Sequence, residues 1–460
     1  MSTAVERRSV ILVTLSLVAV ALAWRLLLSA RTPVPSEDGV SYVWMARQFA
    51  RGEWRAPLGE VFPPLLSLLM APASTLQIDA SLVLRHVEAP ASFGGDGSVH
   101  GSQLVLSLLG ALSVLPIAWL ARRAAGGAQC VCLLAAVLAA LPSLPARYCA
   151  EVYTEPAFAL VIAWAAGCGL RARPWQLGLW SGVAFWLRSE ALLLPLAFVV
   201  LRPRTAWRAA LPALGAVALL ALWRGAAGHG FDPLPKLAFN LPKSAVGSEG
   251  WMAMVSSAAT ALPGAYFEAF GVAGALALLG VWRSRHNADL RPLALTLVLA
   301  VAVVLAFAVR RRFLVAWWPL VIAYAGVGLL DLPRSWRGLA VAAAVVLGVA
   351  GGWRTTERDR LAERAVGAHL HTVLHSGDEV VTDLTRVSYF AGRRPLPPRH
   401  RSADEMIAAA HAPRVRFLVL GSRRPTTAAV RDALPEFAPV ELPAPIARLA
   451  AERGLDVLAR

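Results

Sequence analysis

Two neighbouring carboxylates, Glu37 and Asp38, follow closely after the first membrane-length apolar run of the chain. The run covers residues 9–29, and Asp38 lies nine residues beyond its end in the stretch PSEDGVSYVWMARQFARGEW. A carboxylate just outside the hydrocarbon can take a proton from the hydroxyl group of a substrate held at the membrane surface. An acid here also suits the start of a helix, where the helix dipole favours negative charge. The sequence predicts a membrane enzyme with one of these carboxylates as its base.

A second group of residues able to do chemistry is cationic. Arg188 interrupts an apolar stretch, and Arg310, Arg311 and Arg312 form a turn between two apolar runs. A cation at membrane depth costs roughly 2.5 to 3.5 kcal/mol on insertion, so it usually faces a polar cavity or an anion. The anion available at a bilayer surface is a lipid phosphate, which suits the forked guanidinium group. The alternative is that the three arginines of the turn only extend to the membrane interface.

The composition requires lipid around much of the protein. Hydrophobic residues make up 57% of the 460 residues and charged residues only 16%, too little polar surface for a soluble globule of this size. Runs of the ~20 apolar residues needed to cross a bilayer recur from residue 9 to about residue 352. We therefore predict an α-helical polytopic membrane protein, with a transmembrane domain at residues 1–352 and a small soluble α/β domain at residues 353–460.

The formal net charge of +16 has a topological explanation. Arginines are scattered through short loops and form no aromatic-interleaved basic face, which argues against nucleic acid as a partner. The positive-inside rule makes these loops cytoplasmic, so the N-terminus is expected inside and residues 353–460 outside. About eleven crossings are expected at residues 9–29, 102–121, 128–146, 154–171, two short helices within 174–202 that meet near Arg188, 206–223, 266–282, 290–309, 313–330 and 336–352.

Two segments near the N-terminus have second interpretations. Residues 62–77 are apolar but short and Pro-rich, so we expect a juxtamembrane or re-entrant piece and not a crossing. Ser29-Ala30 offers a weak signal-peptide cleavage site, but the apolar run before it is longer than is usual for a signal peptide. Residues 31–61, which carry the two carboxylates, then form the first outer loop.

The C-terminal region shows the pattern of a small α/β domain. Strand-like runs at residues 379–383 and 415–420 alternate with helix-like stretches at 357–375, 403–412 and 426–434. His371 and His375 are one helical turn apart without a third ligand nearby, so a solvated helix face is expected and no metal site. The four cysteines have no zinc-like or secreted-framework spacing and are expected to be packing residues. Because no glycine pattern for nucleotide binding occurs, a nucleotide-sugar donor is unsupported.

The outer-loop residues resemble those of the C-type (GT-C) glycosyltransferases, above all the branch of the bacterial lipid A aminoarabinose transferases and the dolichyl-phosphate-mannose protein mannosyltransferases. The residues whose order and spacing carry the resemblance are Asp38, Tyr42, Arg47, Gly52, Trp54, Pro57 and Pro63-Pro64-Leu65. Further similarity lies in YCAEVYTEP, which contains Glu155, in Arg188, and in RRFLVAWWPLVIAYAGVGLL. The chain departs from the branch at Val61-Phe62, where acidic and lysine residues are common, and at Gly39, where a second acid is usual.

The resemblance implies a glycosyltransferase whose donor is a sugar linked to a polyprenyl phosphate. It makes Asp38 the base, because its four-residue offset to Tyr42 matches, and leaves Glu37 as the alternative. Glu155 becomes a second catalytic acid that orients the acceptor, binds the sugar or binds a divalent cation, the one cofactor left open. The implied substrate-binding residues are Glu37, Tyr42, Arg47, Arg188, Arg310, Arg311 and Arg312. A phosphate leaving group needs charge stabilisation more than a proton, so a single base suffices for an inverting displacement.

The implied acceptor is a hydroxyl group of a lipid, glycan or protein, and the implied location is the bacterial inner membrane with the site facing outward. A polytopic lipid or polysaccharide transporter is the alternative, although the sequence has no internal repeat and no paired broken segments in corresponding halves. A structural or assembly protein would also explain the spans and the outer domain. It would leave the pattern of Asp38, Glu155, Arg188 and the arginine turn unexplained.

Overall fold

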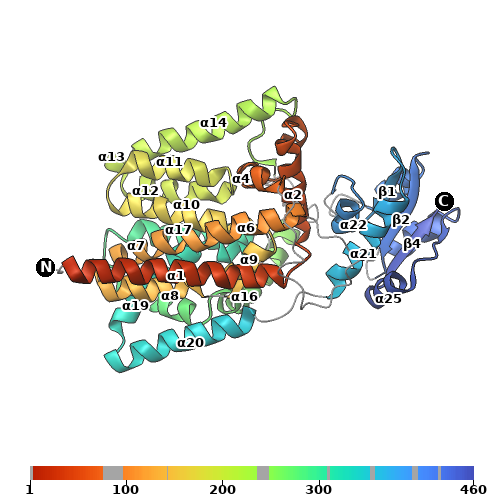
Figure 1. Cartoon of the computed structure of the whole chain (residues 1–460). Coiled ribbons are helices and arrows are strands. Elements are labelled where there is room, and N and C mark those ends of the chain that lie inside the picture. Colours follow the sequence, from red (N-terminus) through yellow and green to blue (C-terminus); the bar gives the residue numbers. More distant parts are fainter. Residues whose placement is uncertain are drawn as a thin grey trace.

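A bundle of helices makes up one end of the molecule and a smaller α/β unit the other (Figure 1). This computed structural model describes residues 4–75, 97–141, 143–235, 248–307, 311–352, 358–395, 402–422 and 426–460. The bundle elements are α1 (Ala4–Ala30), α2 (Glu37–Ala50), α3 (Arg55–Leu58), α4 (Leu65–Ser74), α6 (Gly97–Leu112), α7 (Val114–Ala124), α8 (Gln129–Ala140), α9 (Ser143–Ala150), α10 (Glu155–Leu170), α11 (Pro174–Phe185), η1 (Ser189–Leu192), α12 (Leu193–Leu201), α13 (Pro203–Ala206), η2 (Trp207–Ala209), α14 (Ala210–Ala226), α16 (Ser248–Arg283), α17 (Arg291–Phe307), α18 (Arg311–Val315), α19 (Trp318–Asp331) and α20 (Arg334–Gly352).

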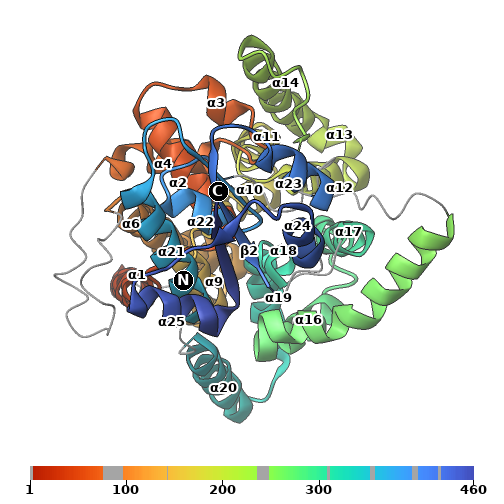
Figure 2. The same cartoon turned by 90° about the vertical axis from the view of Figure 1, so that its right-hand side faces the viewer.

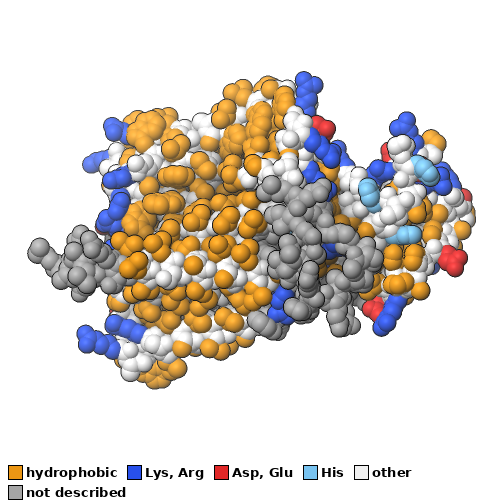
Figure 3. All heavy atoms as spheres, in the orientation of Figure 1, with side chains coloured by type: hydrophobic (Ala, Val, Ile, Leu, Met, Phe, Trp, Pro, Cys, Tyr) orange, Lys and Arg blue, Asp and Glu red, His pale blue; other side chains and the backbone are white. Residues whose placement is uncertain are grey.

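The bundle has the surface of a membrane protein. Hydrophobic side chains cover the visible face of the helices, and Lys and Arg side chains border this band at the end that carries the N-terminus (Figure 3). Among the described residues, four helices are long and apolar enough to cross a bilayer, and α8 with α9 adds a fifth if this bent pair is one span. Several shorter apolar helices, such as α10, α17 and α19, run within the same bundle. The number of membrane crossings, about eleven, stays a prediction.

Several predicted spans differ from the helices that form. The run expected at residues 128–146 is divided into α8 and α9, since Pro142 stands between them in the sequence and lacks the backbone N–H donor that would continue the helix. The run expected at 266–282 belongs to α16, which begins at residue 248 and is kinked at Gly271, where φ is 51°. The two short helices expected within 174–202 are α11 and α12, and Arg188 lies in the turn between them.

Helix α2 lies across the end of the bundle, between it and the α/β unit (Figure 1). Ser36 caps its N-terminus by accepting a hydrogen bond from the backbone N–H of Gly39, and Glu37 and Asp38 occupy its first turn, where the dipole favours acids. The apolar side chains Val40, Val43 and Met45 are fully buried. The Pro-rich segment expected at the membrane surface contains α4, which packs against α2 and α6. The elements around α2 therefore set the position of the first outer loop.

The α/β unit consists of a four-stranded sheet with helices on both faces. The strand order is β1-β2-β4-β3, with β1 parallel to β2 and the other pairs antiparallel. In β2, Phe417 and Val419 join one apolar cluster, whereas Leu418 and Leu420 join another, as the alternation of a strand buried on both faces requires. The elements are α21 (Arg358–Val373), β1 (Glu379–Thr382), α22 (Thr385–Phe390), α23 (Ala403–Ala410), β2 (Val415–Gly421), α24 (Thr426–Ala433), β3 (Ala438–Pro439), α25 (Ala444–Arg453) and β4 (Leu455–Ala459).

The two strand-like runs of the sequence are strands β1 and β2, but β3 and β4 were not expected. The unit lies over the end of the bundle that is opposite to the N-terminus (Figure 1). Viewed from the α/β end, α22 overlies α2, while α14, α16 and α20 reach the periphery of the bundle (Figure 2). Contacts between α2 and α22 confirm that the two helices are neighbours.

Candidate functional site

The Asp38 carboxylate is paired with an arginine from a distant part of the chain. Its Oδ2 atom accepts a hydrogen bond from Nη1 of Arg312 at 2.5 Å. Both side chains are partly buried, with exposed fractions of 24% for Asp38 and 15% for Arg312. Asp38 comes from the first turn of α2 and Arg312 from the short helix α18, so the pair connects the first outer loop to the late arginine turn.

A second arginine lies close to this pair and holds two carboxylates. Nη1 of Arg188 donates to Oε1 of Glu155 at 2.6 Å, and Nη2 donates to Oε1 of Glu190 at 2.8 Å. Glu155 opens α10, which places its carboxylate at a helix N-terminus, and its side chain is 3% exposed. Arg188 itself is 6% exposed. A buried guanidinium between two carboxylates is well compensated, which explains how it is tolerated at this depth.

An aromatic ring connects the two arginines. The guanidinium carbon of Arg188 lies 5.5 Å from the centre of the Phe313 ring, and that of Arg312 lies 5.1 Å from the same ring. The ring of Tyr153 adds a second face to Arg312 at 5.4 Å. Aromatic faces attract cations more strongly where water is excluded. The two guanidinium groups therefore belong to one polar cluster, which also contains Asp38, Glu155 and Glu190.

The phenol of Tyr42 lies in the electrostatic field of this cluster. Its side chain is fully buried one turn after Asp38, and its pKa is raised well above the ordinary value by burial and by the charges of Asp38 and Glu155. Burial and the charge of Glu151 raise the pKa of Tyr153 to about 12. Both phenols are therefore neutral at physiological pH and can donate hydrogen bonds, but they cannot serve as bases. The carboxylates are left as the proton acceptors of the cluster.

Several polar atoms of the cluster have unused hydrogen-bonding capacity. Glu155 Oε2, Arg188 Nε and Arg312 Nε are buried and make no hydrogen bond to another described residue. Unsatisfied buried polar atoms are uncommon in native proteins, and they concentrate where a water or a ligand completes the site. The two guanidinium N–H groups can donate to an anionic group, whereas Glu155 Oε2 can accept a hydrogen bond from a hydroxyl group.

A small cavity lies behind the cluster, toward the bundle interior. Its lining includes Arg25, Glu155 and Trp318, and each of these three side chains has a buried N or O atom without a hydrogen-bond partner in the described structure. Arg25, from α1, is 1% exposed and donates to the carbonyl oxygens of Ala139 and Ala140 at the end of α8. Arg25 thus supplies donors to carbonyl oxygens at the end of α8, where the last four carbonyl groups of a helix have no partner within the helix.

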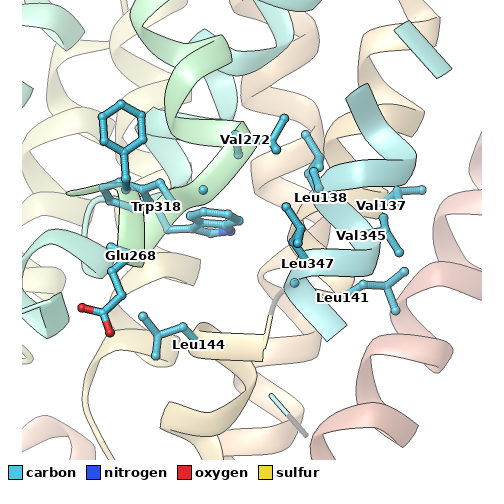
Figure 4. Close-up of a pocket in the computed structure, with 16 residues that line it drawn as sticks. Val137, Leu138, Leu141, Leu144, Glu268, Val272, Trp318, Val345 and Leu347 are labelled. Carbon is cyan, nitrogen blue, oxygen red and sulfur yellow. The ribbon is translucent and has the colours of Figure 1, made fainter. Parts of the chain in front are cut away.

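A larger apolar cavity of about 280 Å³ opens between α8, α16, α19 and α20. Aliphatic side chains, among them Leu138, Leu141 and Leu347, line one side, and the Trp318 ring faces them (Figure 4). The Glu268 carboxylate lies at the edge and points away from these aliphatic groups (Figure 4). It forms an ion pair with Arg311. Hydrocarbon inside this cavity would therefore lie close to the arginine turn.

The structure separates some of the residues that the sequence grouped. Arg311, 49% exposed, is paired with Glu268 and not with the Asp38 cluster. Arg47, at the far end of α2, donates to Ser98 at 2.8 Å and lies over the Tyr389 ring of the α/β unit. The negative charge of Glu37 contributes to the raised pKa of Arg386, so this carboxylate lies within electrostatic range of the α/β unit. Arg310 lies outside the described residues.

The described part of the chain contains no cluster of side chains that could bind a metal ion. Within the described ranges, no three His, Cys, Asp or Glu side chains come close enough together to hold a metal ion. His371 makes a weak contact at 3.4 Å with the Ala391 carbonyl, and His375 is an exposed neighbour of Asp378. Both histidines thus have neighbours within the α/β unit.

The sequence interpretation missed several members of the site. Tyr153 and Phe313 were available in the quoted motifs, but an aromatic residue near a membrane interface usually has an anchoring role. Arg25 was visible as a lone cation within the first apolar run. The high cost of an uncompensated charge at that depth was the signal that could have found it.

Comparison with known proteins supports the fold. No family model and no curated protein matches the sequence. The structure is similar to ArnT from Cupriavidus metallidurans bound to undecaprenyl phosphate, with a TM-score of 0.60, 14% identity and 97% of each chain covered. ArnT in the apo state gives a TM-score of 0.57 with 15% identity over 97% of each chain.

The oligosaccharyltransferase of Archaeoglobus fulgidus, tethered to an acceptor peptide, gives a TM-score of 0.56 with 12% identity. The match covers 88% of this chain and 68% of the archaeal one. ArnT is a lipid A aminoarabinose transferase, and both neighbours are GT-C glycosyltransferases. The resemblance predicted from the outer-loop residues is thus confirmed at the level of the fold.

Proposed function

We propose that the protein is a glycosyltransferase that moves a sugar from a polyprenyl-phosphate donor to an acceptor hydroxyl group at the membrane face. The observation that carries this proposal is the Asp38–Arg312 pair beside Arg188, which puts a candidate base and two phosphate-binding groups in one cluster. The GT-C fold supports it, since one structural neighbour is bound to undecaprenyl phosphate. Positive-inside charge bias supports an outward-facing site in a bacterial inner membrane.

In the proposed reaction, the acceptor oxygen attacks the anomeric carbon as the bond from that carbon to the phosphate oxygen breaks. Asp38 takes the proton of the acceptor hydroxyl, and the polyprenyl phosphate leaves as an anion. Arg188 and Arg312 stabilise the charge that develops on the phosphate. A single displacement of this kind inverts the anomeric centre, and the leaving group needs no separate acid.

Arg312 has two partners in this mechanism. Its Nη1 atom is hydrogen-bonded to Asp38, and its Nε atom is buried without a partner in the described structure. A donor phosphate can take over Nη1 and release the Asp38 carboxylate for proton transfer. Glu155 remains held by Arg188, which suits a role in orienting the acceptor or the sugar more than a role as a free base.

The apolar cavity supplies a place for the lipid part of the donor. Its hydrocarbon lining lies between α8, α16, α19 and α20, and the Arg311–Glu268 ion pair marks its polar edge. Arg311 and Arg312 are adjacent in sequence, so a chain in the cavity and a phosphate at Arg312 can belong to one molecule. Under this proposal Arg311 lies near the point where the polyprenyl chain joins the phosphate.

The test is a transfer assay with the purified full-length protein in lipid nanodiscs. Polyprenyl-phosphate pentoses and hexoses are offered with lipid, glycan and peptide acceptors, and released polyprenyl phosphate is measured by mass spectrometry. We expect release with at least one donor, strongly reduced by Arg312→Ala. Arg283→Ala is the matched control, since Arg283 is 59% exposed and is paired with Asp331, both in loops that are predicted to be cytoplasmic.

Two results would count against the proposal. Equal transfer rates for Arg312→Ala and Arg283→Ala would show that the Asp38–Arg312 pair takes no part in the reaction. Movement of the donor lipid across vesicle membranes, without release of polyprenyl phosphate from any donor, would identify a transporter instead.

A further inference from the structure

The α/β unit contacts the first outer loop through buried arginines. Arg360, Arg364 and Arg386 of this unit have exposed fractions of 9%, 8% and 8%, although arginine is rarely so buried in proteins. They come from α21 and α22, the helices of the unit that lie next to the bundle (Figure 1). Their buried charges therefore belong to an interface between the two parts of the molecule.

Two of these arginines hold the backbone directly before the Asp38 helix. Nε of Arg386 donates to the carbonyl oxygen of Pro35 at 3.0 Å, and Nη1 of Arg364 approaches that of Pro33 at 3.4 Å. Arg386 is fixed in turn by Glu363, whose Oε2 atom accepts from its Nη1 at 2.6 Å. Burial lowers the pKa of Arg386, whereas the charge of Glu363 raises it. The net pKa is raised, so the guanidinium group stays charged.

The other side of the same segment is held by the loop after α9. The backbone N–H and the hydroxyl group of Ser36 both donate to the carbonyl oxygen of Glu151, at 3.1 and 2.9 Å. The Glu151 side chain is paired with Arg360 of the α/β unit at 3.3 Å. A Cβ added at Gly39 would lie 2.4 Å from the Glu151 carbonyl oxygen, so α2 approaches this loop as closely as glycine permits.

This segment can transmit position to Asp38 because it is short and stiff. Pro33 and Pro35 fix their backbone φ angles near −65°, and Ser36 is the N-cap of the helix whose second residue is Asp38. The Asp38 carboxylate must meet both Arg312 and an acceptor hydroxyl. A displacement of about 1 Å in such a group can lower a reaction rate by about 10²-fold.

We propose that the α/β unit positions the catalytic carboxylate, and that Arg386 and Arg364 are the positioning residues that hold residues 33–36 for this purpose. The inference rests on the proposed function, in which Asp38 is the base. It gives the α/β unit an indirect part in the reaction, through the backbone of the first outer loop.

The test compares Arg386→Ala, Arg386→Lys and Arg431→Ala in the full-length protein. Arg431 is the control because it is 57% exposed on the same unit and is paired with Asp456, away from α2. For Arg386→Ala we expect kcat to fall by about 10- to 100-fold while KM for the donor changes by less than about threefold. The lysine variant keeps the charge and one donor and should recover part of kcat, and Arg431→Ala should match the unaltered protein.

Binding of polyprenyl phosphate, measured on the same samples by native mass spectrometry, gives the folded fraction. A folding defect alone lowers that fraction and leaves kcat per binding-competent molecule unchanged, and this result would overturn the proposal. If Arg386→Ala does not accumulate, Arg364→Ala decides, since it leaves the Arg386–Glu363 pair in place. Failure of the proposed function is distinguishable, because transfer would then be absent from the unaltered protein as well.

Discussion

Replacement of Asp38 by Asn should change donor binding and sugar transfer in opposite directions. The amide keeps the shape of the carboxylate but cannot take the acceptor proton, so we expect transfer to fall by about 10²- to 10⁴-fold. The same change removes the carboxylate that occupies Arg312. Because both partners are partly exposed, at 24% and 15%, their ion pair is worth about 1 kcal/mol. A donor phosphate that no longer competes with it should bind up to about fivefold more tightly.

The measurements are a single-turnover transfer rate at saturating donor and an equilibrium titration with a non-transferable donor analogue. Asp289→Asn is the matched control. Asp289 accepts a hydrogen bond from Arg202 at 2.6 Å in loops that are predicted to be cytoplasmic, so its replacement should change neither the transfer rate nor donor binding. Full transfer by Asp38→Asn would refute the assignment of the base and shift it to Glu37 or Glu155. Weaker donor binding by this variant would refute the competition for Arg312.

Three further outcomes are expected. Gly39→Ala should lower the free energy of unfolding by about 1 to 3 kcal/mol and reduce transfer, since its Cβ would meet the Glu151 carbonyl, whereas Gly215→Ala in α14 meets nothing within 4 Å and should be neutral in the same thermal unfolding assay. Arg25→Leu should destabilise the bundle by about 1 to 3 kcal/mol, because two carbonyl oxygens at the end of α8 lose their donor. A reporter active only outside the cytoplasm should work when fused after Arg460, and cytoplasmic activity would reverse the predicted topology.

The meeting of Asp38, Glu155, Arg188 and Arg312 was accessible from sequence because charges in apolar surroundings are costly. Each of these groups lies at or near the end of an apolar run, where an isolated charge would lose several kcal/mol of hydration. The least costly solution is mutual pairing. Long separation in the chain, such as the 274 positions between Asp38 and Arg312, does not weaken this argument.

The sequence alone does not show which of the three arginines in the turn pairs with Asp38. Successive residues of a helix point about 100° apart, so Arg311 and Arg312 of α18 face different neighbours. Which of them faces Asp38 depends on the phase of a five-residue helix and on Glu268, which α16 brings to Arg311. The sequence specifies these charges, but the packing of α16 against α18 assigns the partners.

The break between α8 and α9 is a feature of the fold that the sequence alone also could not specify. An apolar run of spanning length predicts one helix, and prolines within it predict a defect somewhere in the run. The extent of the defect depends on whether the freed carbonyl oxygens find donors, and here they find Arg25, more than 100 residues earlier in the chain. Only the tertiary structure supplies that information.

The Asp38–Arg312 pair also bears on how a transferase of this kind would avoid wasteful chemistry. A base left free at a membrane surface could activate water against a bound donor, and the donor would then be hydrolysed. In the proposed mechanism the base is released by the same event that brings the phosphate to Arg312, so proton acceptance and donor occupancy are coupled through one guanidinium group. Tyr42 and Tyr153 cannot replace Asp38 as bases, because a phenol is protonated at physiological pH and burial raises the pKa of each further. In the proposed mechanism, exchange of the Asp38–Arg312 ion pair therefore contributes to the control of the reaction.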